Sequence, residues 1–225
     1  MCIRDRFSIV EYESEGGNKN IGHGLDKAPE FMIVKALDHA IDWAVYHVSA
    51  GNTGILKLNK ADIFTPSAGA WNNTTPNNQT FRVGGTSFTN GSGSEQGDYI
   101  AYCWHSVPGY SAFGSYTGNS DSNGPFVALS FRPAFLLLKR TNDFNEHWIL
   151  VDSTRSVNNP CAQNLFPDRD VAENTDIGTA WVDFLSNGFE LRADIGPFNA
   201  GSNYIYAAFA ENPFGGSNTS PANAR

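Results

Sequence analysis

The side chains best suited to holding a ligand gather in two long polar stretches, residues 59–78 and 153–179. The first contains Trp71-Asn72-Asn73, and the second contains Asp168-Arg169-Asp170 and is followed closely by Trp181. Indole faces stack on the C–H surfaces of sugars, while amide and carboxylate oxygens satisfy sugar hydroxyls. Long loops without secondary structure of their own are often functional. The candidate ligand-binding residues are therefore Trp71, Asn72, Asn73, Asp168, Asp170 and Trp181.

The two tryptophans also have a structural interpretation, in which each caps the hydrophobic core beneath its loop. This is the favoured interpretation, because large aromatic residues bury more apolar surface than any other side chain. Solvent-exposed indoles in a concave patch would indicate ligand recognition. Burial of both Trp71 and Trp181 would indicate a structural role.

The carboxylates allow two further kinds of site. Asp168-Arg169-Asp170 and Asp121-Ser122-Asn123-Gly124 carry oxygens that calcium accepts, but neither has the full ligand pattern of a calcium loop. A glycan-cleaving enzyme needs two carboxylates roughly 5 to 10 Å apart, which no sequence spacing reveals. Nucleophile elbows, phosphate loops and dinucleotide fingerprints do not occur in the sequence. We expect no catalytic residues, no metal and no cofactor.

The histidines and cysteines have no spacing typical of a metal site. His147 follows Glu146, but adjacent residues on a strand point to opposite faces, so they make a weak acid–base pair. Cys103 lies in an apolar segment and is expected to be buried, whereas Cys161 lies in a Pro/Asn loop. His23 and His105 have no histidine at the equivalent place in the other repeat, so neither belongs to the scaffold that the repeats share. We expect both to be hydrogen-bonded or solvent-facing turn residues.

The elements that must position these side chains occur twice along the chain. Pro29, Phe31 and Lys35 recur 104 residues later in a second strand-like segment, and Tyr99–Trp104 is echoed by Tyr204–Phe209. Short apolar segments separated by Gly-rich turns are typical of β proteins. We predict an all-β fold of two tandem, pseudo-symmetric β-sandwich-like repeats of about 105 residues each. The spacing leaves open whether the repeats have separate cores or share one.

The clearest local element is a hairpin over residues 182–192. Asn187-Gly188 at its centre predicts a two-residue type I′ turn, because both central positions of that turn need positive φ. In this register Phe184 faces Leu191 and Asp183 lies opposite Arg192. One face of the hairpin is then apolar, formed by Val182, Phe184, Phe189 and Leu191.

Composition and charge limit the classes of partner. The net charge is −8, and the Lys and Arg residues are scattered, so we expect no nucleic-acid partner. No apolar run approaches the roughly 20 residues that span a bilayer, and the N-terminus lacks a signal-peptide core. We expect no membrane insertion and no export by the usual secretory route. Residues 1–6 resemble translated sequencing-adapter sequence and are interpreted as non-native.

Several ordered motifs carry a family resemblance. They are Ile21-Gly22-His23-Gly24-Leu25, Trp43-Ala44-Val45-Tyr46-His47, Trp71-Asn72-Asn73, Pro108-Gly109-Tyr110-Ser111, Asp183-Phe184-Leu185-Ser186-Asn187-Gly188-Phe189 and Tyr204-Ile205-Tyr206-Ala207-Ala208-Phe209. With them, residues 7–214 resemble a domain of unknown function found in bacteriophage tail-fibre-like and other virion-associated proteins, often beside laminin-G-like jelly-roll modules. The family has no established catalytic residues.

The resemblance implies a non-enzymatic structural or receptor-facing module of a tail fibre. Such a module would be assembled in the host cytoplasm, reside in the virion, trimerise, and contact other tail proteins or a host surface glycan. The alternative is a carbohydrate-binding module of a bacterial cell-surface protein. The predicted organisation is a first β repeat at 7–108, a second at 109–214, and a flexible tail or linker at 215–225.

Overall fold

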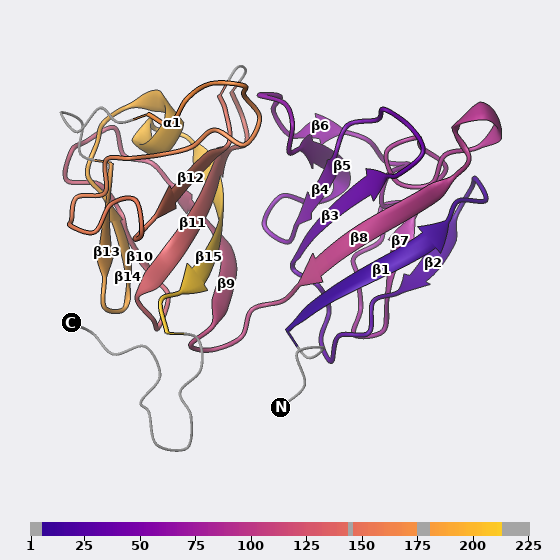
Figure 1. Ribbon diagram of the computed structural model, residues 1–225, viewed down its shortest axis with the longest axis horizontal. Coiled ribbons are helices and arrows are strands. Elements are labelled where there is room, and N and C mark those ends of the chain that lie inside the picture. The colour runs from indigo at the N-terminus through magenta and orange to yellow at the C-terminus, as the bar shows by residue number, and fades with distance from the viewer. Residues whose placement is uncertain (1–5, 144–145, 175–180, 213–225) are drawn as a thin grey trace. The chain divides into compact units, whose positions relative to one another are not determined.

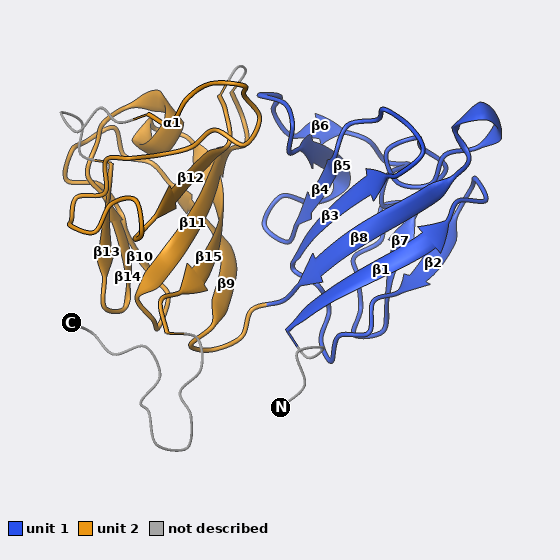
Figure 2. Ribbon diagram, in the orientation of Figure 1, with its two compact units in different colours: residues 1–105 blue, residues 106–225 orange. Residues whose placement is uncertain are grey.

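The computed structural model describes residues 6–143, 146–174 and 181–212. The chain is all-β, as predicted, and separates into two compact units, residues 1–105 and 106–225 (Figures 1 and 2). Of the predicted non-native residues 1–6, residues 1–5 lie outside the described residues, as does the predicted tail at 215–225. Each unit is described by itself below.

Unit 1, residues 1–105, contains two antiparallel sheets. The larger sheet has the strand order β1-β8-β3-β4-β5-β6, and the smaller pairs β2 with β7. The bounds are β1 Phe7–Glu13, β2 Lys19–Gly22, β3 Phe31–Ala36, β4 Ala44–His47, β5 Gly51–Lys57, β6 Thr65–Pro66, β7 Thr80–Val83 and β8 Asp98–Trp104, with a 3-10 turn at Gly93–Glu95.

Alternation along the strands builds the core of unit 1. On β8, Tyr99, Ala101 and Cys103 are buried, whereas Ile100, Tyr102 and Trp104 lie half-buried on the other face. Successive strand residues point to opposite faces, so one face of the large sheet joins the core. Residues of both sheets contribute to this core, including Tyr12, Met32, Val34, Tyr46, Ile55, Trp71, Phe81 and Val83.

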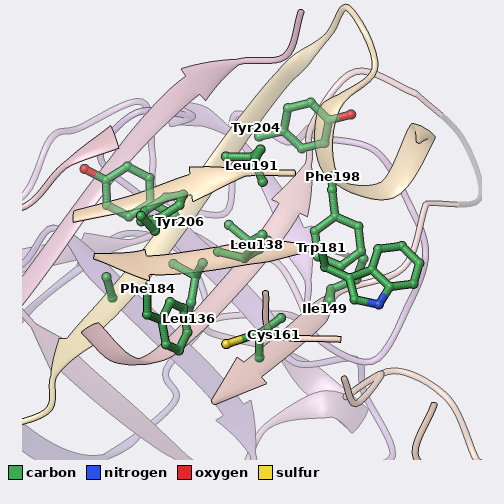
Figure 3. Close-up of a cluster of buried hydrophobic side chains, with 14 of the residues drawn as sticks. Leu136, Leu138, Ile149, Cys161, Trp181, Phe184, Leu191, Phe198, Tyr204 and Tyr206 are labelled. Carbon is green, nitrogen blue, oxygen red and sulfur yellow. The ribbon is translucent and has the colours of Figure 1, made fainter. Parts of the chain in front are cut away.

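Unit 2, residues 106–225, also contains two antiparallel sheets. One has the order β12-β11-β15-β9, and the other has the order β10-β14-β13. The bounds are β9 Ser111–Thr117, β10 Phe126–Ala128, β11 Pro133–Arg140, β12 Ile149–Asp152, β13 Val182–Leu185, β14 Gly188–Leu191, α1 Gly196–Asn199 and β15 Asn203–Ala210. Its buried cluster draws side chains from both sheets (Figure 3).

The two large sheets share a strand order. Read from its free edge, unit 1 runs β1-β8-β3-β4, and unit 2 runs β9-β15-β11-β12. The central strands of the two series, β3 and β11, each pair with a neighbour on both sides. Most side chains of both strands are buried, in agreement with their near-continuous apolar sequence.

Each unit holds its first and last strands together with a pair of stacked tyrosines. Tyr12 lies directly opposite Tyr99 with ring centroids 5.6 Å apart, and Tyr116 lies opposite Tyr204 at 4.9 Å. Tyr12 donates to the Thr89 carbonyl at 2.5 Å. Tyr116 donates in the same way to the Phe198 carbonyl at 2.7 Å. The tyrosines therefore tie the segment before each last strand to the sheet.

A buried asparagine follows each of these carbonyls and holds the loop after the first strand. In unit 1, Asn90 accepts from Glu15 N–H at 3.1 Å and donates to the Gly17 carbonyl at 2.9 Å. In unit 2, Asn199 accepts from Asn119 N–H at 2.9 Å and donates to the Asp121 carbonyl at 2.6 Å. We call these residues the clamp asparagines.

The hairpin of residues 182–191 forms with a different register from the one predicted. Phe184 pairs with Phe189 and Leu185 with Gly188, so the predicted pairing of Phe184 with Leu191 is wrong by two residues. Neither Asn187 nor Gly188 has positive φ, so the turn is not type I′. Gly188 is instead required by close packing, because a Cβ there would lie 2.0 Å from the Val127 carbonyl of β10. The predicted apolar face is fully buried: Val182, Phe184, Phe189 and Leu191.

Candidate functional site

The first predicted ligand residue, Trp71, lies inside the core of unit 1. Its side chain is 1% exposed, its indole N–H donates to the Gly54 carbonyl at 3.1 Å, and its ring packs edge-on against Tyr46. Asn72 and Asn73 follow it in the left-handed conformation, with φ 48° at both residues. Asparagine tolerates this conformation better than most side chains. The two asparagines therefore form the turn that follows the buried Trp71.

The second predicted aromatic residue, Trp181, belongs to the core of unit 2. It is 8% exposed and packs against Phe198, with ring centroids 4.5 Å apart. Figure 3 shows its ring beside Phe198 at the rim of the cluster, with the nitrogen pointing away from the other labelled side chains. That buried nitrogen has no hydrogen-bond partner. Burial of Trp71 and Trp181 matches the structural interpretation of both residues.

The two predicted aspartates of the second loop have different environments. Asp168 is fully buried at its side chain, where one carboxylate oxygen lies 2.7 Å from His147 Nδ1. Its other oxygen, Oδ1, is buried without a partner. Asp170 is exposed. The structure thus pairs Asp168 with a histidine 21 residues away, a contact that no sequence spacing indicated.

The second candidate calcium loop, Asp121–Gly124, lies beside the buried amide of Asn199. Asn199 Nδ2 donates to Asn119 Oδ1 at 2.8 Å and to the Asp121 carbonyl at 2.6 Å. Asp121 Oδ1 accepts from Asn123 N–H at 2.8 Å. The clamp asparagine thus engages the Asn119 side-chain oxygen and the Asp121 carbonyl, and the Asp121 carboxylate caps the turn at Asn123. Across the described ranges, no group of three or more His, Cys, Asp or Glu is placed to hold a metal.

His23 is a fully buried histidine of the scaffold with both ring nitrogens engaged. Its Nε2 lies 2.9 Å from the Asn77 carbonyl, and its Nδ1 accepts from Leu25 N–H at 3.1 Å. These contacts assign the proton of the neutral ring to Nε2. Burial lowers the pKa of His23, the Asn77 hydrogen bond raises it in part, and His105 lowers it further. His23 therefore serves structure in its neutral form.

Both cysteines outside the N-terminal segment are free and buried. Burial raises the pKa of Cys103 to about 12 and that of Cys161 to about 11. The thiolate is the nucleophilic form of cysteine. Neither thiol is therefore activated at neutral pH.

A groove lies on the surface of each unit. In unit 1, a groove of about 440 Å³ is lined by Phe7, Ser8, Ile9, Val10, Gly22, His23 and Gly24. In unit 2, a groove of about 270 Å³ is lined by Arg155, Ser156, Val157, Asn158, Pro160, Ala162 and Gln163. Neither lining contains a carboxylate. The pair of carboxylates that a glycan-cleaving enzyme needs is thus missing from both of these grooves.

The groove of unit 1 follows β1, a strand that sequence reasoning did not select. Among the described strands, β1 is the first of its sheet and pairs only with β8, while β2 pairs only with β7. The groove therefore lies along a strand edge with no neighbour. The available signal was the outer face of β1, which reads Phe7, Ile9, Glu11 and Glu13 and changes from apolar to acidic along the strand.

The fold and its grooves define an all-β protein of two sandwich-like units with an open strand edge in the first. The chain belongs to the family described as a domain of unknown function, DUF7483, whose model matches residues 4–213. No curated protein and no solved structure matches the chain. No helix of the described ranges is long and apolar enough to cross a membrane.

Proposed function

We propose that the protein is a non-enzymatic structural or receptor-facing module of a phage tail fibre or a related virion appendage. The observation that carries this proposal is the burial of Trp71 and Trp181, which supports a structural role for both tryptophans. The clamp asparagines, which are buried, bind backbone groups of the loops that follow the first strand of each unit. The virion setting rests on the motif resemblance described above.

We also propose that the two units arose by internal duplication and that the protein assembles into an oligomer. The shared strand order of the two large sheets and the two clamp asparagines support descent of both units from one ancestral repeat. We expect the module to act as a homotrimer that contacts other tail proteins and a host-surface glycan, after assembly in the host cytoplasm.

The virion setting can be tested by identifying the genes that flank the gene for this protein. Long-read sequencing of the source sample should place the gene among tail and baseplate genes. A position inside a polysaccharide-utilisation cluster would contradict the proposal. Sedimentation velocity of the purified chain tests the assembly separately, with a trimer as the expected species.

A carbohydrate-binding module of a bacterial cell-surface protein is the second candidate. It is favoured by an aromatic cluster on the outer face of the large sheet of unit 1, where Phe7 stacks on Trp104 at 4.8 Å and on Tyr102 at 6.4 Å. Aromatic rings of this kind can stack on sugars. These residues replace Trp71 and Trp181 as the aromatic candidates for recognition.

Glycan-array binding by the wild-type chain tests this candidate. Trp104→Ala should abolish any binding, whereas Phe126→Ala, at an exposed phenylalanine of unit 2, should leave it unchanged. Equal loss in the two variants, or no bound glycan, would remove the carbohydrate candidate.

A further inference from the structure

We propose that β1 is a docking edge for an extended peptide segment of another protein, which joins the six-stranded sheet as an additional antiparallel strand. The peptide that fits carries basic residues opposite Glu11 and Glu13 and apolar residues opposite Phe7 and Ile9. This partner interface is independent of the virion setting proposed above.

The hydrogen-bond pattern shows which backbone groups of β1 point away from the sheet. Ser14 N–H donates to the Gly97 carbonyl at 2.9 Å, in the same register as the β1–β8 pairing. Residues of an antiparallel strand alternate between bonding the neighbouring strand and pointing away from it. The backbone groups at even positions, 8 to 14, therefore face β8. Those at odd positions, 7 to 13, face the free edge.

These outward groups are unpaired over most of the strand. At the far end, the Glu13 carbonyl accepts from Lys19 Nζ at 2.9 Å. Phe7, Ile9 and Glu11 bond to no other described residue through their outward N–H and C=O groups. Such a row is a template for another strand. The groove of about 440 Å³ runs beside it, walled on the other side by Gly22 and Gly24.

The equivalent strand of unit 2, β9, has hydrogen-bond partners along part of the corresponding edge. On β9, Ser111 exchanges hydrogen bonds with Val107 at 3.0 and 3.1 Å. Phe113 N–H, two residues further on, donates to Ser106 Oγ at 3.2 Å. The chain just before β9 thus satisfies its edge at the two positions that correspond to Phe7 and Ile9 of β1.

The acidic side chains of β1 indicate which peptide sequence would pair with it. Glu11 and Glu13 are exposed on the same face as Phe7 and Ile9, and Ile9 is 55% exposed. Directly opposite side chains on paired strands interact, and opposite charges stabilise the pair. A peptide running antiparallel to β1 therefore matches it with the pattern Lys-x-Lys-x-apolar-x-apolar. The intervening residues must be small to medium, because they face Ser8 and Val10 in the groove.

A second copy of this chain is a poor match for the same edge. Antiparallel pairing of two β1 strands about Val10 places Glu11 of one copy opposite Ile9 of the other. It also places Glu13 opposite Phe7. Each acidic side chain then faces an apolar residue, which pairs poorly in a sheet. The pattern of β1 thus disfavours self-association and leaves a basic partner strand as the occupant.

The probe is a fluorescein-labelled peptide, Lys-Thr-Lys-Val-Val-Thr-Val, with Glu-Thr-Glu-Val-Val-Thr-Val as its charge-reversed control. Fluorescence anisotropy with the full chain should show about tenfold tighter binding of the lysine peptide, because two cross-strand charge pairs differ. The Glu11→Lys/Glu13→Lys variant should reverse this preference. The Glu95→Lys/Asp194→Lys variant, which changes net charge equally at two exposed sites, should keep it.

Proline tests the strand-addition geometry separately from charge. Ile9→Pro removes an outward N–H and no bond to β8, a position where an edge strand accepts proline. It should abolish binding, whereas Ile9→Thr should weaken it only partly. Bound peptide should also slow amide exchange in residues 6–13. Equal binding of the two peptides, no binding, or full binding by Ile9→Pro would overturn the proposal.

Discussion

The first strands of the two large sheets, β1 and β9, occupy the same place in their strand orders and differ in what covers them. On β9, Ser111 and the Phe113 N–H bond outward to Val107 and Ser106, whereas the outward groups of β1 at Phe7, Ile9 and Glu11 bond to no other described residue. The strand β1 is also acidic at its far end, while β9 carries no charged residue. One scaffold position is therefore closed in unit 2 and open in unit 1.

The long loops differ in a second way. Trp71 of unit 1 has its indole N–H bonded to Gly54, and the corresponding nitrogen of Trp181 in unit 2 has no partner. Both rings are buried, so the difference lies in polar satisfaction rather than in packing. A buried donor without a partner costs free energy that a bonded one does not. Among the described residues, the indole of Trp71 is thus more completely hydrogen-bonded than that of Trp181.

The largest expected effect comes from removing either indole. Trp71→Ala and Trp181→Ala should each lower the free energy of unfolding by about 3–5 kcal/mol, since each leaves a large cavity. Hydrogen–deuterium exchange should show the loss of protection in unit 1 for Trp71→Ala and in unit 2 for Trp181→Ala. An equal loss in both units for either variant would contradict the assignment of each tryptophan to its own core.

The clamp asparagines should give the next largest effect. Asn90→Ala and Asn199→Ala should each cost about 1–3 kcal/mol, because each leaves buried backbone groups unpaired. Asn199 should be the costlier of the two, since its side chain makes three hydrogen bonds, to Asn119 N–H, Asn119 Oδ1 and the Asp121 carbonyl. Urea unfolding of both variants measures the order, and a larger cost for Asn90→Ala would reverse it.

Replacing each indole by a phenyl ring tests polar satisfaction directly. Trp71→Phe should be about 1 kcal/mol more destabilising than Trp181→Phe, because only Trp71 loses a hydrogen bond. Both variants lose similar apolar volume, so each serves as the control for the other. Equal costs in urea unfolding would show that the nitrogen of Trp181 finds a partner in solution.

The smallest expected effect is a pH dependence of stability that His23 gives to unit 1 alone. The pKa of His23 is lowered in the folded state, so the unfolded chain binds a proton first as pH falls through about 6.5. Stability from this group is fully present above that pH and declines below it, down to the folded pKa. His23→Gln should flatten the decline in unit 1 measured by amide exchange between pH 7 and 5. An unchanged decline would assign it to other groups.

Much of the fold could be predicted because its strands are local apolar segments. The recurrence of Pro29, Phe31 and Lys35 located β3 and β11, and the Tyr-Ile segments located β8 and β15. The hairpin register was missed because Asn187-Gly188 matched a turn motif, whereas the structure uses Gly188 for contact with β10. The sequence indicates which residues suit a turn. It does not indicate which other strand will pack its backbone closely against a glycine.

The candidate site was harder to predict, for two physical reasons. Whether the side chains of Trp71 and Trp181 are exposed depends on how the surrounding chain packs over them. The amino-acid composition does not determine that packing. The open edge of β1 depends on strand order, since the same seven residues would be covered in the middle of a sheet. The acidic residues Glu11 and Glu13 were visible in the sequence, but their meaning depends on the absence of a neighbouring strand in the described structure.

The amide of Asn199 inside the loop of residues 119–123 has a consequence for the conditions that the protein tolerates. A bound ion can be removed by dilution or by a chelator, but a side chain is attached to the same polypeptide and stays at a fixed high local concentration. We therefore expect these contacts to persist when divalent cations are removed from the medium.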